Sequence, residues 1–298
     1  MTESAGAFRC GHVAIIGRPN VGKSTLVNRL VGERISITSK KAQTTRHRVA
    51  GILTTPDAQL ILVDTPGFQT RHRSRLNERM NRLVTESLAT VDAVVLVVEA
   101  GRTVPADRAV IDLVPRRIAA VAALNKVDAL ADKNELLPQI AALVALRPFA
   151  AIVPLSAAKG TALTSLVAEV RALLPESPPL YDADEITDRD ERFLAAEFVR
   201  EKIFRLLGEE VPYQTTVAIE EFRHEGDLRR IRATIYVDRD NQRAILIGAG
   251  GAKMKEIGAA ARADLERLFG GKVFLELWVR VRKGWIDDDG ALTRLGYS

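Results

Sequence analysis

Two different spacings of apolar residues divide the chain near residue 175. Before that point, short apolar runs alternate with segments whose apolar residues recur every three or four positions. The runs predict strands at 12–16, 46–55, 59–64, 92–98, 118–124 and 151–155, and the other segments predict helices near 23–32, 72–90, 105–115, 133–147 and 161–174. Such alternation predicts an α/β fold, a mostly parallel sheet with helices on both faces.

The rest of the chain has another order of elements. A helical pattern runs from 191 to 207, and the segments 215–222 and 228–239 alternate apolar and polar residues like a hairpin. A short turn of helix follows, then an amphipathic helix, and residues 273–282 close with strict alternation. The helix carries its apolar residues at helical spacing: Met254, Ile257, Ala261, Leu265 and Leu268. The order α-β-β-α-α-β predicts a smaller α+β domain.

A polar segment separates the two parts. Residues 175–191 contain three prolines and seven acids, a composition typical of a linker. We therefore expect one domain at 1–175, a linker at 176–191 and a second domain at 192–298. The first 175 residues hold 23 Lys+Arg against 14 Asp+Glu, and the remainder hold 20 against 24. The second domain therefore lacks the overall basic charge common among nucleic-acid binders.

The composition bears on the compartment. The start of the chain lacks the basic residues and apolar stretch of a secretory signal. The most apolar stretch, 136–157, is interrupted by proline, glutamine and arginine, so it does not predict a membrane span. Cys10 is the only cysteine, which excludes an internal disulfide and suits a reducing environment. These features predict a cytoplasmic protein.

The first chemical motif is GRPNVGKS, residues 17–24, between a predicted strand and a predicted helix. This is the phosphate-binding loop pattern G-x-x-x-x-G-K-S in the context that it requires. Gly17 and Gly22 allow the backbone N–H groups to wrap phosphates, Lys23 reaches the β- and γ-phosphates, and Ser24 ligates Mg²⁺. The alternative is a chance match in a glycine-containing turn, which the flanking strand and helix make rare.

Three later motifs specify the nucleotide. In LILVDTPG (60–67), Asp64 is placed to hold the Mg²⁺ water shell and Gly67 to donate its N–H to the γ-phosphate. In NKVD (125–128), the Asp128 carboxylate would accept the N1–H and amino group of guanine, whereas adenine presents a bare acceptor there. SAAKG (156–160) would supply a backbone N–H to the guanine carbonyl.

These motifs follow the carboxyl ends of predicted strands, where parallel sheets bind ligands, and their order matches the small GTPases. We expect Mg²⁺ at Ser24 and Asp64, and catalytic roles for Lys23 and Gly67. The expected nucleotide-binding residues are Gly17, Arg18, Pro19, Asn20, Val21, Gly22, Lys23, Ser24, Thr25, Asp64, Thr65, Pro66, Gly67, Asn125, Lys126, Asp128, Ser156, Ala157 and Ala158.

Residues 39–48, SKKAQTTRHR, are polar, basic and without a clear period, which suits a switch loop whose threonine closes onto Mg²⁺. Their basic residues could form either a solvated loop or part of an RNA-facing surface: Lys40, Lys41, Arg46, His47 and Arg48. Together with residues 33–38 and 65–75, this loop is expected to be ordered by GTP.

Phe68 stands where Ras-like proteins carry the glutamine that orients the attacking water. In this the sequence resembles the hydrophobic-substituted GTPases. That resemblance favours Thr45 over Thr44 as the Mg²⁺ ligand and gives Thr45 a catalytic role. It also implies that Asn20 helps to bind a K⁺ ion that supplements charge in the transition state. The alternative is that Asn20 is only a turn residue. We expect slow intrinsic turnover in either case.

A second glycine loop, ILIGAGGAKMKEIG, occupies residues 245–258. A nucleotide loop would follow a buried strand, whereas this one joins two predicted helices. I-G-x-x-G-x-x-M instead matches the KH loop, which clamps about four nucleotides of single-stranded nucleic acid. Residues 239–283 hold ten Lys+Arg against five acids, and Trp278 and Trp285 are as readily packing residues as base platforms. The alternative is a glycine-capped turn. The expected RNA-binding residues are Ile247, Gly248, Ala249, Gly250, Gly251, Lys253, Met254, Lys255, Arg282 and Lys283.

A GTPase domain followed by a type II KH domain resembles the Era family of bacterial ribosome-assembly GTPases. The resemblance covers nearly the whole chain, in GRPNVGKSTLVN, ISITSKKAQTTRHR, DTPGF, NKVD, ITDRDERF, LIGAGGAKMKEIG and LELWVRVRKGW. It implies a monomeric switch that binds GTP or GDP with Mg²⁺, binds the 3′ end of 16S rRNA, and assists 16S rRNA processing and assembly of the small (30S) subunit. Members of this family also associate peripherally with the cytoplasmic face of the cell membrane.

Ala249 departs from the family pattern, because many KH loops carry lysine or another polar residue there. We expect one phosphate contact fewer. Two rival functions stay open. A tRNA-modifying GTPase shares the loop subgroup but has different flanking domains and a C-terminal cysteine. An RNA-binding module with a relic nucleotide site is disfavoured by the intact Lys23, Asp64 and Asp128, and would show RNA affinity independent of nucleotide.

Overall fold

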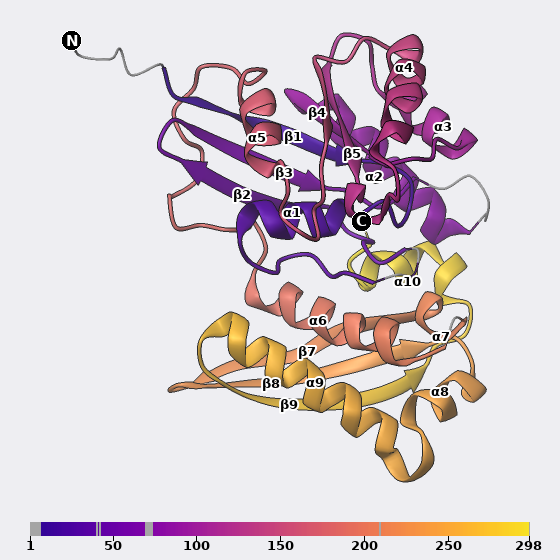
Figure 1. Ribbon diagram of the computed structural model, residues 1–298. Coiled ribbons are helices and arrows are strands. Elements are labelled where there is room, and N and C mark those ends of the chain that lie inside the picture. The colour runs from indigo at the N-terminus through magenta and orange to yellow at the C-terminus, as the bar shows by residue number, and fades with distance from the viewer. Residues whose placement is uncertain (1–6, 40, 42, 69–73, 209, 298) are drawn as a thin grey trace. The chain divides into compact units, whose positions relative to one another are not determined.

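The computed structural model describes residues 7–39, 41, 43–68, 74–208 and 210–297, shown in Figure 1. By its contacts the chain forms two compact units. The first comprises residues 1–36, 45–72 and 80–188, and the second comprises residues 37–44, 73–79 and 189–298. The predicted limits at residues 175 and 192 stay predictions. The second unit takes in two short segments that the sequence assigns to the first domain.

The sheet of the first unit is built from buried apolar runs. Its strands are β1 (Arg9–Ile16), β2 (Val49–Thr55), β3 (Ala58–Asp64), β4 (Ala93–Glu99), β5 (Ala119–Asn125) and β6 (Ala151–Pro154). Their order is β2-β3-β1-β4-β5-β6; β2 pairs antiparallel with β3, and the other pairs are parallel. All seven residues of β3 are buried, as expected for a strand covered on both faces. The predicted mostly parallel α/β sheet is confirmed.

Helices cover this sheet. They are α1 (Lys23–Val31), α2 (Arg75–Ala89), α3 (Pro105–Leu113), α4 (Leu136–Leu146) and α5 (Leu163–Arg171), with short 3₁₀ turns at Val127–Ala129 and Lys133–Glu135. Residues of α2, α3 and α4 form one core cluster with Ala14 and Ile16 of β1. The alternate residues Val13 and Ile15 are also fully buried, on the opposite face, where α1 and α5 lie (Figure 1).

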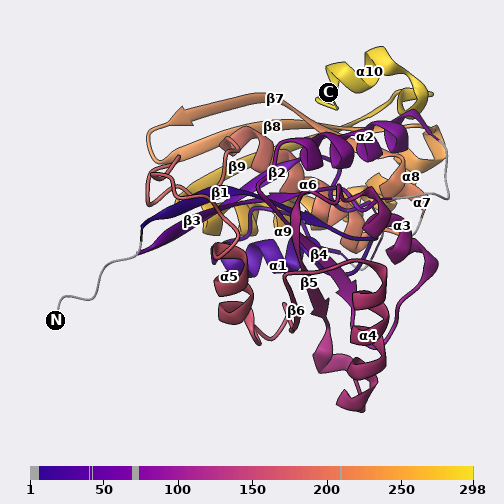
Figure 2. The same cartoon turned by 90° about the horizontal axis from the view of Figure 1, so that it is seen from above.

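The second unit has a three-stranded sheet. A long hairpin of β7 (Thr215–Glu225) and β8 (Leu228–Val237) is visible in Figures 1 and 2, and β9 (Lys272–Val281) pairs in parallel with β8. Helices α6 (Glu191–Leu206) and α9 (Ala252–Phe269) pack on one face of this sheet and share a core with it. Phe274 and Trp278 of β9 are exposed. The predicted α+β domain is confirmed.

Short elements complete the second unit. They are α7 (Glu210–Tyr213), α8 (Asp240–Ile247), α10 (Asp289–Arg294) and 3₁₀ turns at Ala249–Gly251 and Trp285–Asp287. Trp285 is fully buried, stacks on Tyr297 with ring centroids 6.0 Å apart, and donates its indole N–H to the Gln214 carbonyl. Trp285 is therefore a packing residue, which resolves one of the two tryptophan alternatives.

Candidate functional site

The phosphate-binding loop joins β1 to α1 and depends on its glycines. Gly17 has φ +156°, and a Cβ on it would lie 2.4 Å from the Val97 carbonyl oxygen. Gly22 has φ +102°, and a Cβ on it would lie 2.3 Å from Nδ2 of Asn125. Asn20 also takes a left-handed φ, of 66°. A side chain at either glycine would collide with the protein, so only glycine permits this tight loop.

Lys23, the first residue of α1, points back over the loop. Its Nζ donates to the carbonyl oxygens of Gly17, at 3.0 Å, and of Arg18, at 3.1 Å. Burial lowers the pKa of Lys23 to about 8, although the Asp64 carboxylate opposes that shift. The lysine thus has a geometry in which its ammonium group can reach phosphates bound in the loop.

Three oxygen-bearing side chains gather beside Lys23. The hydroxyls of Ser24 and Thr45 are 2.7 Å apart, and Oγ1 of Thr45 lies 3.4 Å from Oδ2 of Asp64. Asp64 is fully buried, which raises its pKa against the opposing effect of Lys23. Its other oxygen, Oδ1, is buried without a hydrogen-bond partner. Two hydroxyls and a carboxylate are a donor set that suits Mg²⁺, which binds few protein oxygens and keeps several waters. The predicted metal residues Ser24, Thr45 and Asp64 therefore fit that ion.

The loops after β5 and β6 are tied to the phosphate-binding loop by Asn125. Its Nδ2 donates to the Val21 carbonyl at 2.8 Å, and its Oδ1 accepts from the Ala157 N–H at 2.9 Å. Lys126 follows with a left-handed φ of 70° and pairs with Glu99 at 3.2 Å. Asp128 is exposed at the start of the 3₁₀ turn after β5. Asn125 thus links the loops that follow β1, β5 and β6. The carboxylate of Asp128 is exposed and so stays accessible to the base of a nucleotide.

Arg18 contributes an ion-pair network that the sequence pattern did not reveal. Its guanidinium binds Glu99 at the end of β4, at 2.5 Å, and the buried Asp107 of α3, at 3.1 Å. Glu99 also pairs with Lys126, and although burial opposes it, hydrogen bonds and charges from Arg18 and Lys126 lower the pKa of Glu99. These pairs brace the phosphate loop and the guanine motif against the same strand end. Their residues are too far apart in sequence to form a pattern.

The segment after β3 closes the site from another side. The Thr65 hydroxyl donates to the Ile15 carbonyl at 2.9 Å, and a Cβ on Gly67 would lie 2.8 Å from the backbone of Pro19. Phe68 packs against the core formed with α2, α3 and α4, so its position offers no polar group to orient water. Residues 69–73 of the predicted switch regions lie outside the described residues, as do Lys40 and Ala42.

One expectation for the basic switch cluster is wrong. Arg46 is fully buried, so it belongs neither to a solvated loop nor to an RNA-facing surface. The sequence alone does not predict the burial of Arg46, because a short basic loop has no apolar spacing that would indicate it. The structure leaves His47 and Arg48 partly exposed, and Lys41 donates to the carbonyls of Leu207 and Gly208.

The second glycine loop joins α8 to α9. Gly248, Gly250 and Gly251 all have left-handed φ, at +73°, +56° and +81°. A Cβ on Gly248 would lie 2.8 Å from Lys253, whereas a Cβ on Gly250 or Gly251 would meet nothing within 4 Å. The outer part of this loop therefore presents open backbone, the form that an extended strand of RNA can approach.

A groove of about 610 Å³ runs from this loop between the helices and β9. The predicted residues Ile247, Gly251, Met254 and Lys255 line it. Two further cations, Arg243 and Arg262, and the exposed Trp278 also line it. Arg282 and Lys283 lie beyond the lining, at the end of β9, and Lys253 pairs with Glu256 at 2.7 Å.

No cluster of three or more His, Cys, Asp or Glu side chains within the described part of the chain could hold a metal. Among the described helices, none is both long and apolar enough to cross a membrane.

Comparisons with known proteins agree on both glycine loops. Residues 12–126 match the family model described as 50S ribosome-binding GTPase, and residues 210–286 match that of the KH domain. GTPase Era of Nitrosomonas eutropha is 54% identical over 295 residues, covering 99% of this chain and all of the relative. GTPase Era of Stenotrophomonas maltophilia is 54% identical over 290 residues, covering 97% of each chain.

Two solved structures are similar over nearly the full length. A single-substitution variant of Aquifex aeolicus Era, bound to GDP and AlF₄⁻, has a TM-score of 0.94, 38% identity and coverage of 98% of this chain and 100% of its own. Era in complex with MgGDPNP and nucleotides 1506–1542 of 16S ribosomal RNA has a TM-score of 0.94, 39% identity and coverage of 98% and 99%. The first of these relatives is bound to a nucleotide, and the second is bound to both a nucleotide and a segment of 16S ribosomal RNA.

Proposed function

This chain belongs to the GTPase Era family, and from that premise we propose that it is a GTP-controlled switch that binds the 3′ end of 16S rRNA and assists rRNA processing and assembly of the 30S subunit. It is a GTPase with a KH domain. The rival function in tRNA modification has no support among these relatives.

The observation that carries the proposal is the pairing of two phosphate-binding loops of different form in one chain. The loop at residues 17–24 is enclosed, with Lys23 and a Mg²⁺-type donor set beside it. The loop at residues 248–251 is open and leads into a groove lined by Lys255, Arg243 and Arg262. The first form suits a compact nucleotide, and the second suits a strand of RNA.

The hydrolytic mechanism follows from the first loop. Lys23 stabilises the charge that develops on the transferred phosphoryl group, and the backbone N–H of Gly67 binds its oxygens. Ser24 and Thr45, with Asp64 behind them, would hold Mg²⁺, and the ion would neutralise negative charge on the phosphates of the nucleotide. Because Phe68 offers no polar group to the attacking water, we expect slow intrinsic turnover, and Asn20 would help to hold a K⁺ ion that adds positive charge near the phosphates.

The test is an RNA titration. A short single-stranded RNA copying the 3′ end of 16S rRNA is titrated against the full chain with GDP or with GDPNP. Wild type binds it more tightly with GDPNP, and Gly251→Asp loses that binding because a carboxylate on the open loop repels the RNA backbone. Equal RNA affinity in the two nucleotide states would contradict the switch and favour the RNA-binding module with a relic site.

Gly226→Asp is the matched control. Gly226 lies at the tip of the β7–β8 hairpin with φ +61°, and a Cβ added there would meet nothing within 4 Å, so the change repeats the backbone strain and added charge of Gly251→Asp elsewhere in the same domain. It should bind RNA as wild type does. If both variants lose RNA binding equally, the loss reflects charge or folding and not the KH loop.

The place of action follows from the proposed partner. A protein that binds 16S rRNA acts in the cytoplasm, and we propose a monomer there. Peripheral association with the cytoplasmic face of the cell membrane is a further proposal, drawn from the family resemblance. Sedimentation of the full chain with and without phospholipid vesicles tests both statements.

A further inference from the structure

Helix α6 carries four charged side chains that are almost completely buried. Glu197, Arg200, Glu201 and Lys202 expose 7%, 1%, 0% and 6% of their surface. Charged residues are rarely buried to this degree unless they are paired, because removing them from water is costly. The partners of these four side chains therefore identify the segments that α6 binds. Several of them are made with residues 37–44, here called the switch segment, which belongs to the same compact unit as α6.

Arg200 binds the last residue of the switch segment. Its Nε and one terminal nitrogen donate to the two oxygens of Glu197, at 2.8 and 2.6 Å, and the guanidinium lies over the Phe204 ring. The same terminal nitrogen donates to the carbonyl oxygen of Thr44. Burial opposes the charge of Arg200, but Glu197 more than compensates and the pKa of Arg200 is raised. The donor to Thr44 thus stays charged.

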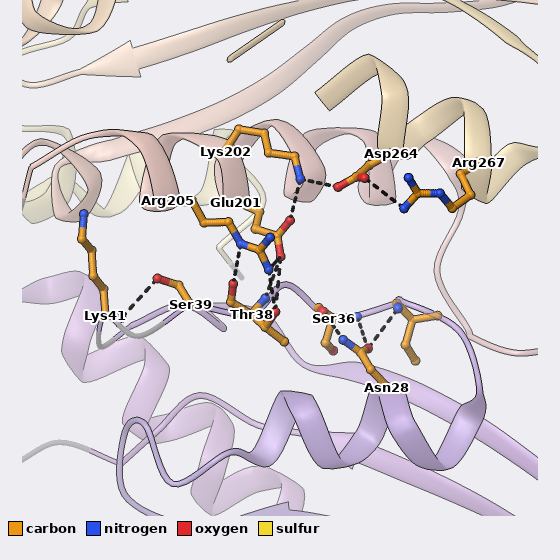
Figure 3. A network of polar contacts seen from close by, with 11 residues as sticks. Asn28, Ser36, Thr38, Ser39, Lys41, Glu201, Lys202, Arg205, Asp264 and Arg267 are labelled. Atoms are coloured by element: carbon orange, nitrogen blue, oxygen red, sulfur yellow. Dashed lines mark hydrogen bonds and ion pairs between the residues drawn. The ribbon is translucent and has the colours of Figure 1, made fainter. Parts of the chain in front are cut away.

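Glu201 and Arg205 bind the start of the switch segment, as Figure 3 shows. A Glu201 carboxylate oxygen accepts from the backbone N–H of Thr38 at 3.1 Å, and Arg205 donates to the Thr38 carbonyl at 3.2 Å and hydroxyl at 3.0 Å. Lys202 balances the charge of Glu201 and also binds Asp264 of α9. The switch segment is therefore held on α6 at both of its ends.

The residues on either side of the switch segment are fixed to the nucleotide-binding unit. Asn28 of α1 accepts from the N–H groups of Ile35, at 3.0 Å, and Ser36, at 2.9 Å, and donates to the Ser36 carbonyl (Figure 3). Thr45, next in the chain after Thr44, places its hydroxyl 2.7 Å from that of Ser24. The Thr44 carbonyl and the Thr45 N–H belong to one planar peptide group, so whatever orients the former orients the latter.

We propose that Arg200 is a positioning residue for GTP hydrolysis: through the Thr44 carbonyl it sets the position of Thr45 at the Mg²⁺ site, so that a helix of the RNA-binding unit controls the nucleotide-binding unit. This inference rests on the proposed function and names the residues that would carry its nucleotide dependence. Because coupling is reciprocal, binding of Mg²⁺ and GTP at Thr45 would in turn bias how α6 holds the switch segment.

Two variants isolate the Arg200 contact. Glu197→Gln keeps Arg200 and its bond to Thr44, whereas the double variant Glu197→Gln/Arg200→Met removes that donor without leaving a buried carboxylate unpaired. Fluorescent GDPNP binding is measured over a Mg²⁺ series, and hydrogen exchange is measured on the peptide 37–45. A hydrogen bond to a charged donor corresponds to about a tenfold or larger change in an equilibrium constant. Relative to the single variant, we expect the Mg²⁺ requirement and the exchange rate to rise about tenfold, kcat to fall similarly, and GDP affinity to change less than about twofold.

A milder pair of variants guards against misfolding of the double variant. Arg205→Gln removes contacts to Thr38 from a side chain that is 44% exposed, and Arg267→Gln removes a bond to Asp264 in the same network from a side chain that is 75% exposed (Figure 3). Only Arg205→Gln should increase exchange in the peptide 37–45. Arg200→Lys, which keeps a donor, should restore part of the Mg²⁺ affinity lost in the double variant.

The outcomes separate the two proposals. If wild type neither hydrolyses GTP nor binds the RNA, the proposed function fails. If wild type does both, but the double variant shows the Mg²⁺ requirement of Glu197→Gln and only a lower melting temperature, Arg200 merely stabilises its own unit and the positioning role is overturned.

Discussion

Replacing Asn125 by alanine should weaken nucleotide binding more than it destabilises the fold. The side chain is 2% exposed and makes two hydrogen bonds, to the Val21 carbonyl and from the Ala157 N–H. Each typical bond contributes about 1 kcal/mol, and a buried partner left unpaired costs about 1–3 kcal/mol. The variant should therefore lose roughly 3 kcal/mol from the state in which all three loops are in register. Without nucleotide, the loops can shift so that the unpaired groups bind water. We therefore expect the free energy of unfolding to fall by only about 1 kcal/mol.

The remainder should fall on ligand binding, because the nucleotide requires the ordered loops. About 2 kcal/mol corresponds to roughly a thirtyfold rise in the GDP dissociation constant. Fluorescent GDP titration and urea unfolding without nucleotide measure the two parts. Gln139→Ala is the matched control, because Gln139 is a 7% exposed amide that also bridges loops, to the Glu99 carbonyl at 2.9 Å and from the Gly101 N–H at 2.8 Å. It should destabilise the fold and leave GDP affinity intact. Wild-type GDP affinity in Asn125→Ala, or an equal loss in Gln139→Ala, would refute the reasoning.

Three further predictions concern charge. The pKa of Lys23 is about 8 in the folded protein against 10.5 in the unfolded chain. Its contribution to stability is therefore fully present above pH 10.5 and is lost as the pH falls to 8. Urea unfolding without nucleotide should show at most about 3 kcal/mol of this pH dependence, and the Lys23→Met variant should lack it. GTP hydrolysis should be about tenfold faster in K⁺ than in Na⁺. Asn20→Gly should abolish that difference, and glycine tolerates the left-handed φ of 66° at this position. Equal rates of the wild type in the two salts would show that Asn20 is only a turn residue. Ala249→Lys should tighten RNA binding and steepen its salt dependence by about 0.7 in the logarithmic slope, and an unchanged slope would contradict a phosphate contact there.

The sequence predicted those features whose physical cause is local. A strand, a glycine loop and a helix in succession specify the phosphate-binding loop, because its φ values and its Lys23 all lie within eight residues. The same holds for the order of elements in both domains, since apolar spacing reports burial directly. Even the gathering of Ser24, Thr45 and Asp64, now seen within hydrogen-bonding distance, follows from motif order once the fold class is known.

The features that were missed depend on partners distant in sequence. The apolar spacing of residues 191–207 predicts a helix, but in the sequence Arg200 and Glu201 look like ordinary surface charges. Their partners lie in residues 37–44, more than 150 positions away. Arg18 with Glu99, and the closing helix α10, are similar cases. Whether a charged side chain is buried depends on its tertiary contacts, so the spacing of residues along one helix does not predict it.

The two glycine loops finally differ in why they need glycine, and that difference separates their functions. At Gly17 and Gly22 a Cβ would strike the protein itself, within 2.4 Å, so the requirement for glycine comes from contacts inside the fold. At Gly250 and Gly251 a Cβ would meet nothing within 4 Å, so the fold requires only the left-handed φ at these positions. The absence of side chains there leaves the outer side of the loop open to a ligand. A substitution at Gly22 should therefore damage the fold together with nucleotide binding, whereas one at Gly251 should spare the fold and damage only the approach of RNA. The crowded loop at residues 17–24 thus suits the compact nucleotide proposed for it, and the open loop at residues 248–251 suits the proposed strand of RNA.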